Sequence, residues 1–371
     1  MTYSLDKESH IPKYYQLYKI LKKEILTKFK DGERFYSQRE LMKRFNFSLA
    51  TVDKALTTLM NDSLIDRTQG KGTFVRLKPV EKKLQKTLAV LLPYIDGAFY
   101  FKIVAGIEDA TREKGFHTIL CSTSGSGGEK EDYFNRLITD SKADAFLIAP
   151  TETYLKDDLF PKIRESNLPL ILFPQIEDSW KKEFDYVVCD DVQGSYEAVS
   201  HLIKLGHKRV AFMGCMGRDN FIFKNRLRGY RHALSDAGFL FDDSLIFNSE
   251  WGTEPDSYET GMQILKSKER PTAVFAISDQ MAIAFMKAAA DSGVNIPEDI
   301  SIVGFDNIEK ASYPEIALTT VSQPAYQIGR KVAEEAILKL TDSSRGKQVK
   351  VILDTELIVR KTTALCGANT L

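Results

Sequence analysis

Residues 37–75 read SQRELMKRFNFSLATVDKALTTLMNDSLIDRTQGKGTFV. Ser37 stands three residues before Glu40, the capping-box pattern that starts a helix, and the helical pattern continues to about Phe45. A tight turn follows, and Ser48 can cap a further helix whose apolar residues recur at intervals of three and four. These signals predict two helices joined by a tight turn.

The sequence on either side of these helices completes a small module. Residues 12–28 carry apolar side chains at helical spacing, which predicts an earlier helix. Residues 64–67 and 73–75 predict two short strands around a glycine-containing tip at 69–72. Three helices and a β-ribbon make a winged helix-turn-helix, whose third helix fits the major groove while the wing lies along the neighbouring backbone. We therefore expect residues 1–76 to bind double-stranded DNA.

The charge distribution agrees with this expectation. The 371 residues have a net charge of zero, with 51 Lys and Arg and 51 Asp and Glu. Residues 1–86 hold 19 basic and 10 acidic side chains, a net of +9, and the remainder holds 32 and 41, a net of −9. A basic head on an acidic body suits a polyanion, because contacts to phosphates release counterions. A solvated basic surface would give the same asymmetry.

Residues 77–86 are charged and lack apolar periodicity, so they are expected to be a linker. From residue 87 onward, apolar runs of strand length alternate with helical stretches, and the alternation restarts at Gly194. Helices are expected at about 99–114 and 130–141, from Gly194 to Leu205, and around 226–237. This pattern predicts two parallel sheets in series, flanked by helices. The fold class is α/β, with a two-lobed, periplasmic-binding-protein-like domain over 87–365 and a ligand between its lobes.

Several function classes are excluded by what the sequence lacks. No apolar run is long enough to span a membrane, and the N-terminus has no secretory signal, so we expect a cytoplasmic protein. The four cysteines are far apart and lie in or beside apolar runs, which predicts buried, reduced thiols. The five histidines form no ligand pair, and no catalytic constellation is present. We expect no metal, no cofactor and no enzymatic activity.

The N-terminal module resembles the GntR family of bacterial transcription regulators. The match is carried by QGKGTFV at 69–75 and by the frame SxxTVxKALxxL at 48–59. The resemblance implies DNA contacts from the helix-turn-helix and the wing, namely Ser37, Gln38, Arg39, Ser48, Leu49, Ala50, Thr51, Asp53, Lys54, Gln69, Gly70, Lys71 and Gly72.

Two positions depart from the GntR pattern. Leu49 and Asp53 stand where the family usually has arginines. This moves the expected base reading to Arg39 and the wing. Asp53 is expected either to accept a hydrogen bond from a cytosine amino group or to pair with a nearby arginine. A degenerate module that does not bind DNA is the alternative.

The larger domain resembles the effector domain of the LacI/GalR repressors. The match is carried by GHKRVAFMG at 206–214, NRLRGYRHAL at 225–234, IPEDISIVGFDN at 296–307 and TELIVRKTT at 355–363. A GntR head on a LacI-type body is the arrangement of the arabinose-repressor subgroup. The resemblance implies a homodimeric repressor of carbohydrate-utilisation genes that a small sugar controls.

The resemblance also implies a set of effector-binding residues. These are Arg226 and Asp306 as the main polar contacts, Trp251 as a stacking surface, Ser278 and Gln323 as further polar contacts, and Tyr94, Phe99 and Tyr100 at the lip of the first lobe.

Structural roles are the alternative for several of these residues. Arg226 and Asp306 could form an ion pair across the lobes, and Trp251, Phe99 and Tyr100 could be packing residues. Two neighbouring acidic positions are also open to a structural role: Asp279 could be a helix N-cap, and Asp190-Asp191 could shape the hinge.

The identity of the effector stays open at this level. A pentose or deoxyhexose, such as arabinose or fucose, suits one tryptophan and an Arg/Asp pair. A purine or nucleoside effector, a sugar-dependent activator and a sugar-binding transport protein are the alternatives.

Overall fold

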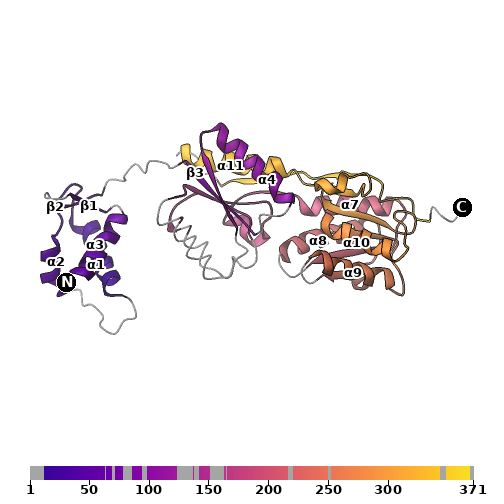
Figure 1. Cartoon of the computed structure of the whole chain (residues 1–371), viewed down its shortest axis with the longest axis horizontal. Coiled ribbons are helices and arrows are strands. Elements are labelled where there is room, and N and C mark those ends of the chain that lie inside the picture. The colour runs from indigo at the N-terminus through magenta and orange to yellow at the C-terminus, as the bar shows by residue number, and fades with distance from the viewer. Residues whose placement is uncertain are drawn as a thin grey trace. The chain divides into compact units, whose positions relative to one another are not determined.

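The computed structural model describes residues 12–62, 64–68, 72–77, 86–93, 98–122, 137, 142–150, 163, 165–215, 220–249, 252–342 and 348–367. The chain divides into two compact units, Met1–Lys83 and Leu84–Leu371, whose elements are labelled in Figure 1.

The first unit is the predicted winged helix. Its elements are α1 (Lys13–Lys28), α2 (Gln38–Phe45), α3 (Leu49–Asn61), β1 (Ile65–Thr68) and β2 (Gly72–Val75), and the two strands pair antiparallel. Ser37 and Glu40 form the expected capping box, and Ser48 caps α3. Asn46 adopts a left-handed φ of 53° between the two helices, which makes the tight turn. The core contains Leu21, Leu41, Val52 and Leu56 among its buried side chains.

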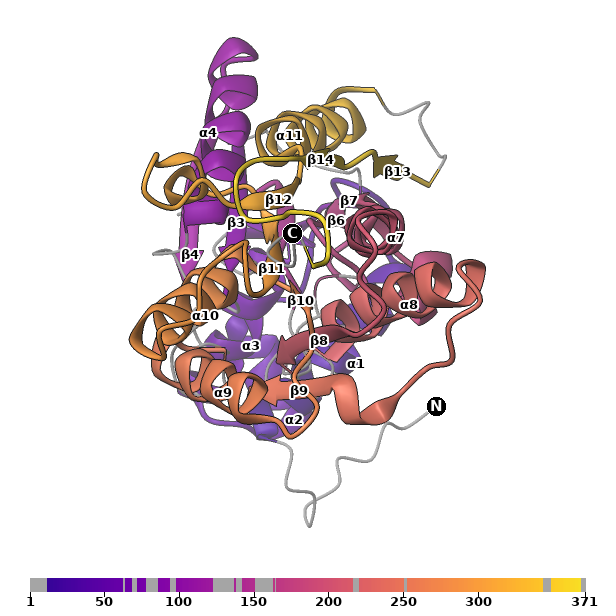
Figure 2. The same ribbon diagram turned by 90° about the vertical axis from the view of Figure 1, so that its right-hand side faces the viewer.

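The second unit contains two six-stranded sheets that are flanked by helices (Figure 2). The first sheet has the order β13-β7-β6-β5-β3-β4, and all its pairs are parallel. Its elements are β3 (Thr87–Leu92), α4 (Ala98–Glu113), β4 (His117–Ser122), β5 (Ala145–Ile148), β6 (Leu170–Leu172), η2 (Asp178–Lys182), β7 (Asp185–Cys189), α11 (Ala325–Thr341) and β13 (Lys350–Leu353). These elements form what we call the first lobe.

The second sheet has the order β14-β12-β11-β10-β8-β9, in which only β14 pairs antiparallel. Its elements are α7 (Asp191–Lys204), β8 (Val210–Cys215), α8 (Asn220–Asp236), η3 (Asp243–Leu245), β9 (Ile246–Ser249), α9 (Glu254–Lys266), β10 (Ala273–Ala276), α10 (Asp279–Asp291), β11 (Ser301–Asp306), η4 (Glu309–Ser312), β12 (Thr319–Ser322) and β14 (Glu356–Ile358). These form the second lobe. The chain passes between the lobes after β7, after β12 and after β13, so the predicted two-lobed α/β class is confirmed.

Glycines allow two helix pairs to pack backbone to backbone. A Cβ on Gly106 of α4 would overlap the carbonyl of Tyr326 in α11, and one on Gly329 would overlap the carbonyl of Ile103. In the second lobe, a Cβ on Gly229 of α8 would overlap the carbonyl of Val192 in α7. These contacts fix α8 against α7 and so position the side chains that α8 carries.

Several predicted boundaries are wrong. Helix α7 begins at Asp191 and not at Gly194, because the side chain of Asp190 accepts a hydrogen bond from the Gln193 amide and caps the helix earlier. Helix α8 begins at Asn220, six residues before the predicted start. The helix predicted over 130–141 lies largely outside the described residues.

The cysteines follow the prediction only in part. Cys121 and Cys189 are buried and Cys215 is half-buried, but Cys366 is exposed, which contradicts the expectation of a buried thiol. Cys366 lies beyond the last strand, where its backbone amide donates to the carbonyl of Leu205 at 2.8 Å. Its apolar neighbour Leu365 is also exposed, so the apolar stretch that suggested burial covers no core there.

No helix among the described residues has the length and apolar character needed to cross a membrane.

Candidate nucleic-acid interface and ligand site

Ion pairs around a buried glutamate join α1 to α2. Glu24 of α1 is fully buried, accepts two hydrogen bonds from the Arg44 guanidinium of α2 at 2.7 and 3.0 Å, and pairs with Lys28 at 2.7 Å. Burial alone would raise the pKa of Glu24, but the hydrogen bonds from Arg44 and Lys28 outweigh it and lower that pKa. The sequence analysis missed this cluster, because Glu24 and Arg44 meet only after α1 and α2 pack together.

The start of α3 is open to solvent. Leu49 is 54% exposed and Ala50 is exposed. The Ser48 hydroxyl accepts from the Thr51 amide at 3.4 Å and lies 3.0 Å from the Thr51 hydroxyl. Four predicted contact residues therefore lie together at the helix N-terminus, where the helix dipole also favours phosphate.

Asp53 pairs with an arginine, which was one of its two predicted roles. Its Oδ1 accepts a hydrogen bond from Gln38 Nε2 of α2 and lies 3.1 Å from Arg67 Nη1 of β1. Asp53 therefore connects α3 to both α2 and the wing. Its negative charge is paired with Arg67 inside the head, which reduces its repulsion of a nearby phosphate.

The remaining predicted DNA-contact residues differ in the contacts that they make within the head. Arg39 is exposed on α2 and makes no hydrogen bond or ion pair with another described residue. The Lys54 ammonium lies 4.2 Å from the centre of the Tyr14 ring. Gly72 has a φ of +115° where β2 begins, and a Cβ there would lie 3.5 Å from Nε of Arg34, a cation that the sequence analysis did not single out. Gln69, Gly70 and Lys71 lie outside the described residues.

Arg226 is the centre of the candidate ligand site. It lies on α8 and is 3% exposed, and its guanidinium stacks 3.6 Å from the centre of the Phe305 ring. Its Nε and Nη2 donate to Asp191 Oδ1 at 2.9 and 2.8 Å, and Nη1 lies 3.5 Å from Asp306 Oδ1 and donates to the Ile277 carbonyl. Asp191 is therefore its closer acidic partner, a role that the sequence analysis did not foresee.

Arg226 and Asp306 form the ion pair that was the structural alternative, but they do not form it across the lobes. Both residues belong to the second lobe, on α8 and at the end of β11. Asp306 has a φ of 118°, an uncommon backbone conformation for a residue with a side chain. Its Oδ1 also accepts from Gln323 Nε2 at 2.6 Å, and Gln323 Oε1 accepts from the buried Cys189 thiol at 2.9 Å. A chain of polar contacts thus runs from Cys189, where β7 ends in the first lobe, to Arg226.

A further buried carboxyl, that of Asp279, belongs to the same lobe. Asp279 is fully buried and accepts from the Thr320 hydroxyl at 2.5 Å and from the Ile308 amide at 2.8 Å. It is not the N-cap of α10, because that role belongs to Ser278, whose hydroxyl accepts from the Met281 amide at 3.3 Å. Ser278, two residues after the end of β10, therefore caps α10 through its hydroxyl oxygen and keeps its hydroxyl hydrogen for another partner.

Burial and like charge raise the pKa values of these acids. Burial raises the pKa of Asp306, although Arg226 and the hydrogen bond from Gln323 oppose it. Burial and the nearby Asp306 charge raise the pKa of Asp279. Burial likewise raises the pKa of Asp191 against the pull of Arg226. The Arg226 guanidinium pairs directly with two carboxyl groups, those of Asp191 and Asp306. The cluster therefore holds more hydrogen-bond acceptors than its one cation can satisfy.

The predicted aromatic residues are only partly placed. Phe99 and Tyr100 on α4 are half-buried, contact each other edge to face at 5.6 Å, and pack against the core of the first lobe. Tyr94 and Trp251 lie outside the described residues. One contact crosses the lobes near this point, because Lys102 of α4 donates to the Asn307 carbonyl at 3.1 Å.

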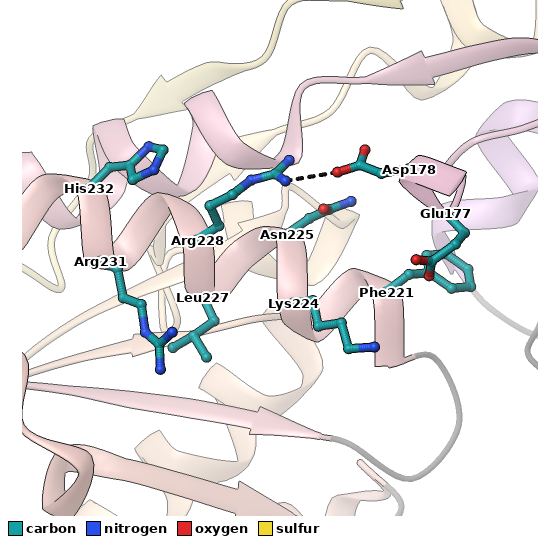
Figure 3. A pocket seen from close by; sticks show the side chains of 9 residues that line it. All are labelled: Glu177, Asp178, Phe221, Lys224, Asn225, Leu227, Arg228, Arg231 and His232. Atoms are coloured by element: carbon teal, nitrogen blue, oxygen red, sulfur yellow. Dashed lines mark hydrogen bonds and ion pairs between the residues drawn. The ribbon is translucent and has the colours of Figure 1, made fainter. Parts of the chain in front are cut away.

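A cavity of about 380 Å³ lies elsewhere, between η2 and α8 (Figure 3). None of the predicted effector-binding residues lines it. Its lining side chains are exposed or half-buried, except for the buried ring of Phe221.

A winged helix joined to two parallel sheets with a polar cluster at their strand ends defines the class of ligand-responsive DNA-binding regulators. Comparisons with known proteins agree with this class. Residues 13–75 match the gntR family of bacterial regulatory proteins, and residues 199–363 match the periplasmic binding protein-like domain. Among curated relatives, the arabinose metabolism transcriptional repressor of Geobacillus stearothermophilus is 32% identical over 96% of this chain and 99% of its own.

Two further proteins are similar over about three quarters of this chain. The transcriptional regulator DegA of Bacillus subtilis is 33% identical over 76% of this chain and 82% of its own. A solved LacI family regulator from Enterococcus faecium, with bound ribose, has a TM-score of 0.66 and 26% identity over 75% of this chain and 99% of its own. The chain belongs to the family of transcription regulators that join a GntR-type DNA-binding domain to a LacI-type, periplasmic-binding-protein-like domain. These relatives are regulators and not enzymes.

Proposed function

We propose that the chain is a cytoplasmic, homodimeric repressor of carbohydrate-utilisation genes, which a small neutral sugar releases from its operator. The full-length similarity to an arabinose metabolism repressor supports the regulated process. The ribose bound to the Enterococcus faecium relative supports a pentose, such as arabinose, or a deoxyhexose such as fucose.

The observation that carries the proposal is the Asp191–Arg226–Asp306–Gln323 cluster. Sugar hydroxyls are recognised by charged, bidentate hydrogen-bond partners held in fixed positions. Asp306 uses Oδ1 for both Arg226 and Gln323, and its Oδ2 has no partner among the described residues. The Asp306 side chain is also 17% exposed, so the carboxyl group is partly open to a ligand. Trp251, Tyr94, Phe99, Tyr100 and Ser278 complete the proposed site.

The proposed DNA interface uses the open N-terminus of α3, Arg39 on α2 and the wing around Gly72. A two-fold dimer would place one such head on each half of a palindromic operator. The number of chains bound per operator, measured by analytical ultracentrifugation, tests the dimer.

The site is tested by thermal unfolding of the full-length protein with monosaccharides and with nucleobases. We expect a pentose or deoxyhexose to raise the melting temperature, and Asp306→Asn to abolish this rise. Glu309→Gln is the matched control, since it removes an exposed acid of the same segment. A melting temperature that responds only to nucleobases would replace the sugar with a purine. An unchanged response in Asp306→Asn would refute the site.

The DNA-binding role is tested by gel shift with operator sequences selected from random DNA. We expect Asp306→Asn to bind the selected DNA as tightly as the unmodified protein but to ignore the sugar. Failure of the unmodified protein to select any sequence would refute the function as a whole.

A further inference from the structure

Helix α8 presents two different faces. Arg226 points inward, where it contacts Asp191 and stacks on Phe305. Lys224, Arg228 and Arg231 follow one another at intervals of four and three residues, so they share a different face of the helix. This second face lines the 380 Å³ cavity and contributes nothing to the Arg226 cluster.

The cavity joins the two lobes. Its other wall comes from Glu177 and Asp178, which lie between β6 and β7 in the first lobe. Figure 3 shows the Arg228 side chain extending from α8 toward this segment, and Arg228 Nη1 lies 2.8 Å from Asp178 Oδ2. The buried ring of Phe221 adds an apolar surface at the start of α8.

The charge of the cavity is opposite to that of the domain around it. Three cations line it against two acids, and one of those acids, Asp178, is also paired with Lys181 at 2.7 Å. Lys224 and Arg231 have no ion pair or hydrogen bond with any other described residue. Residues 87–371 carry a net charge of −9. A positive hollow on an acidic domain concentrates anions from solution.

We propose that this cavity is a second ligand site, which binds a small phosphate-bearing metabolite and is separate from the effector site. A cavity of 380 Å³ is within the usual range of about 300–1,000 Å³ for small-molecule sites. Arginine binds phosphate through two parallel hydrogen bonds, and lysine adds a point charge. Phe221 and Leu227 would face the carbon skeleton, while Glu177 can accept from a hydroxyl.

Binding at this site exchanges one partner of Arg228 for another. The phosphate takes the place of Asp178, and Asp178 keeps Lys181 as its partner, so no carboxylate is left unpaired. The Arg228–Asp178 contact is a direct bridge between the lobes. Occupation of the site therefore removes a contact between the first and second lobes.

The test is isothermal titration calorimetry of the full-length protein with glycerol 3-phosphate, and with glycerol as the uncharged control. We expect one phosphate site per chain and no heat from glycerol. Lys224→Gln/Arg228→Gln should weaken binding by about tenfold or more, equivalent to about 1.4 kcal/mol. Lys208→Gln/Lys268→Gln removes two exposed lysines of the same lobe and should change nothing.

The effector-site variant Asp306→Asn should bind glycerol 3-phosphate normally, which separates this site from the proposed sugar site. The unfolding midpoint of each variant, followed by tryptophan fluorescence, verifies that it is folded. Unchanged binding in Lys224→Gln/Arg228→Gln would overturn the proposal, since the phosphate would then be bound elsewhere, such as on the basic head. An equal loss in the control variant, or no binding to the unmodified protein, would also overturn it.

Discussion

Replacement of Arg226 by alanine tests how the ligand site is held together. The substitution removes the two hydrogen bonds to Asp191, the ion pair with Asp306 and the stacking on Phe305. Asp191 is 4% exposed and would be left as a buried, uncompensated carboxylate. Breaking such a pair by removing one partner costs about 3–5 kcal/mol.

Protonation limits this cost. A carboxyl with an ordinary pKa of 3.8 can escape the penalty by taking up a proton. At pH 7 this costs about 4.4 kcal/mol, at 1.36 kcal/mol for each unit of pKa. We therefore expect Arg226→Ala to lower the free energy of unfolding of the larger unit by about 3–4 kcal/mol. Removing the orphaned acid as well, in Arg226→Ala/Asp191→Ala, should restore about 2 kcal/mol of it.

Urea unfolding followed by tryptophan fluorescence measures this directly. The chain has two tryptophans, Trp180 and Trp251, and both belong to the larger unit. The matched control is Arg228→Ala, two residues along the same helix, where the arginine side chain is 43% exposed and its ion pair contributes about 1 kcal/mol or less. The reasoning is refuted if Arg226→Ala and Arg228→Ala are equally stable, or if Arg226→Ala/Asp191→Ala is no more stable than Arg226→Ala.

Three further predictions concern the buried acid, the recognition helix and the helix pairs. Burial raises the pKa of Asp279 to about 8, so the folded state holds the carboxyl proton more tightly than the unfolded state does. The stability that Asp279 contributes therefore falls as the pH rises from about 4 to 8. Urea midpoints at pH 5.5 and 8 should therefore differ less in Asp279→Asn than in the unmodified protein; equal differences would contradict the shift. Asp53→Ala should release Arg67 to contact phosphate, which raises the DNA affinity and steepens its salt dependence by about one unit. Weaker DNA binding with an unchanged salt dependence would instead show that Asp53 reads a base. Gly106→Ala should lower the melting temperature through an overpacking cost of about 1–3 kcal/mol, whereas stabilisation, the usual effect of alanine in a helix, would disprove the close α4–α11 contact.

The fold was largely predictable because its signals are local. The capping residues Ser37 and Ser48 start helices whose apolar spacing is evident in the sequence. Buried parallel strands appear as continuous apolar runs, as at 88–92 in β3. The start of α7 was missed although Asp190 offers a recognisable N-cap, because the prediction gave more weight to Gly194. Strands β13 and β14 have alternating or weak burial and gave no usable run.

The site was predictable only in its individual residues. Resemblance supplied Arg226, Asp306 and Gln323, and the structure brings these three together. Asp191 lies 35 residues before Arg226, and only the packing of α7 on α8 makes them partners. Contacts of this kind depend on tertiary packing and leave no periodic signal in the sequence. The same holds for the Glu24–Arg44 pair in the head.

The central claim is that a sugar bound at the Arg226 cluster controls the DNA affinity of the head. Fluorescence anisotropy of a labelled operator, titrated with the full-length protein with and without the sugar that raises its melting temperature, measures this coupling. The account predicts that the sugar weakens DNA binding by about 5–150-fold, or about 1–3 kcal/mol, and that Asp306→Asn loses this effect while keeping its DNA affinity. A sugar that binds and stabilises the protein but leaves the operator affinity unchanged would contradict it.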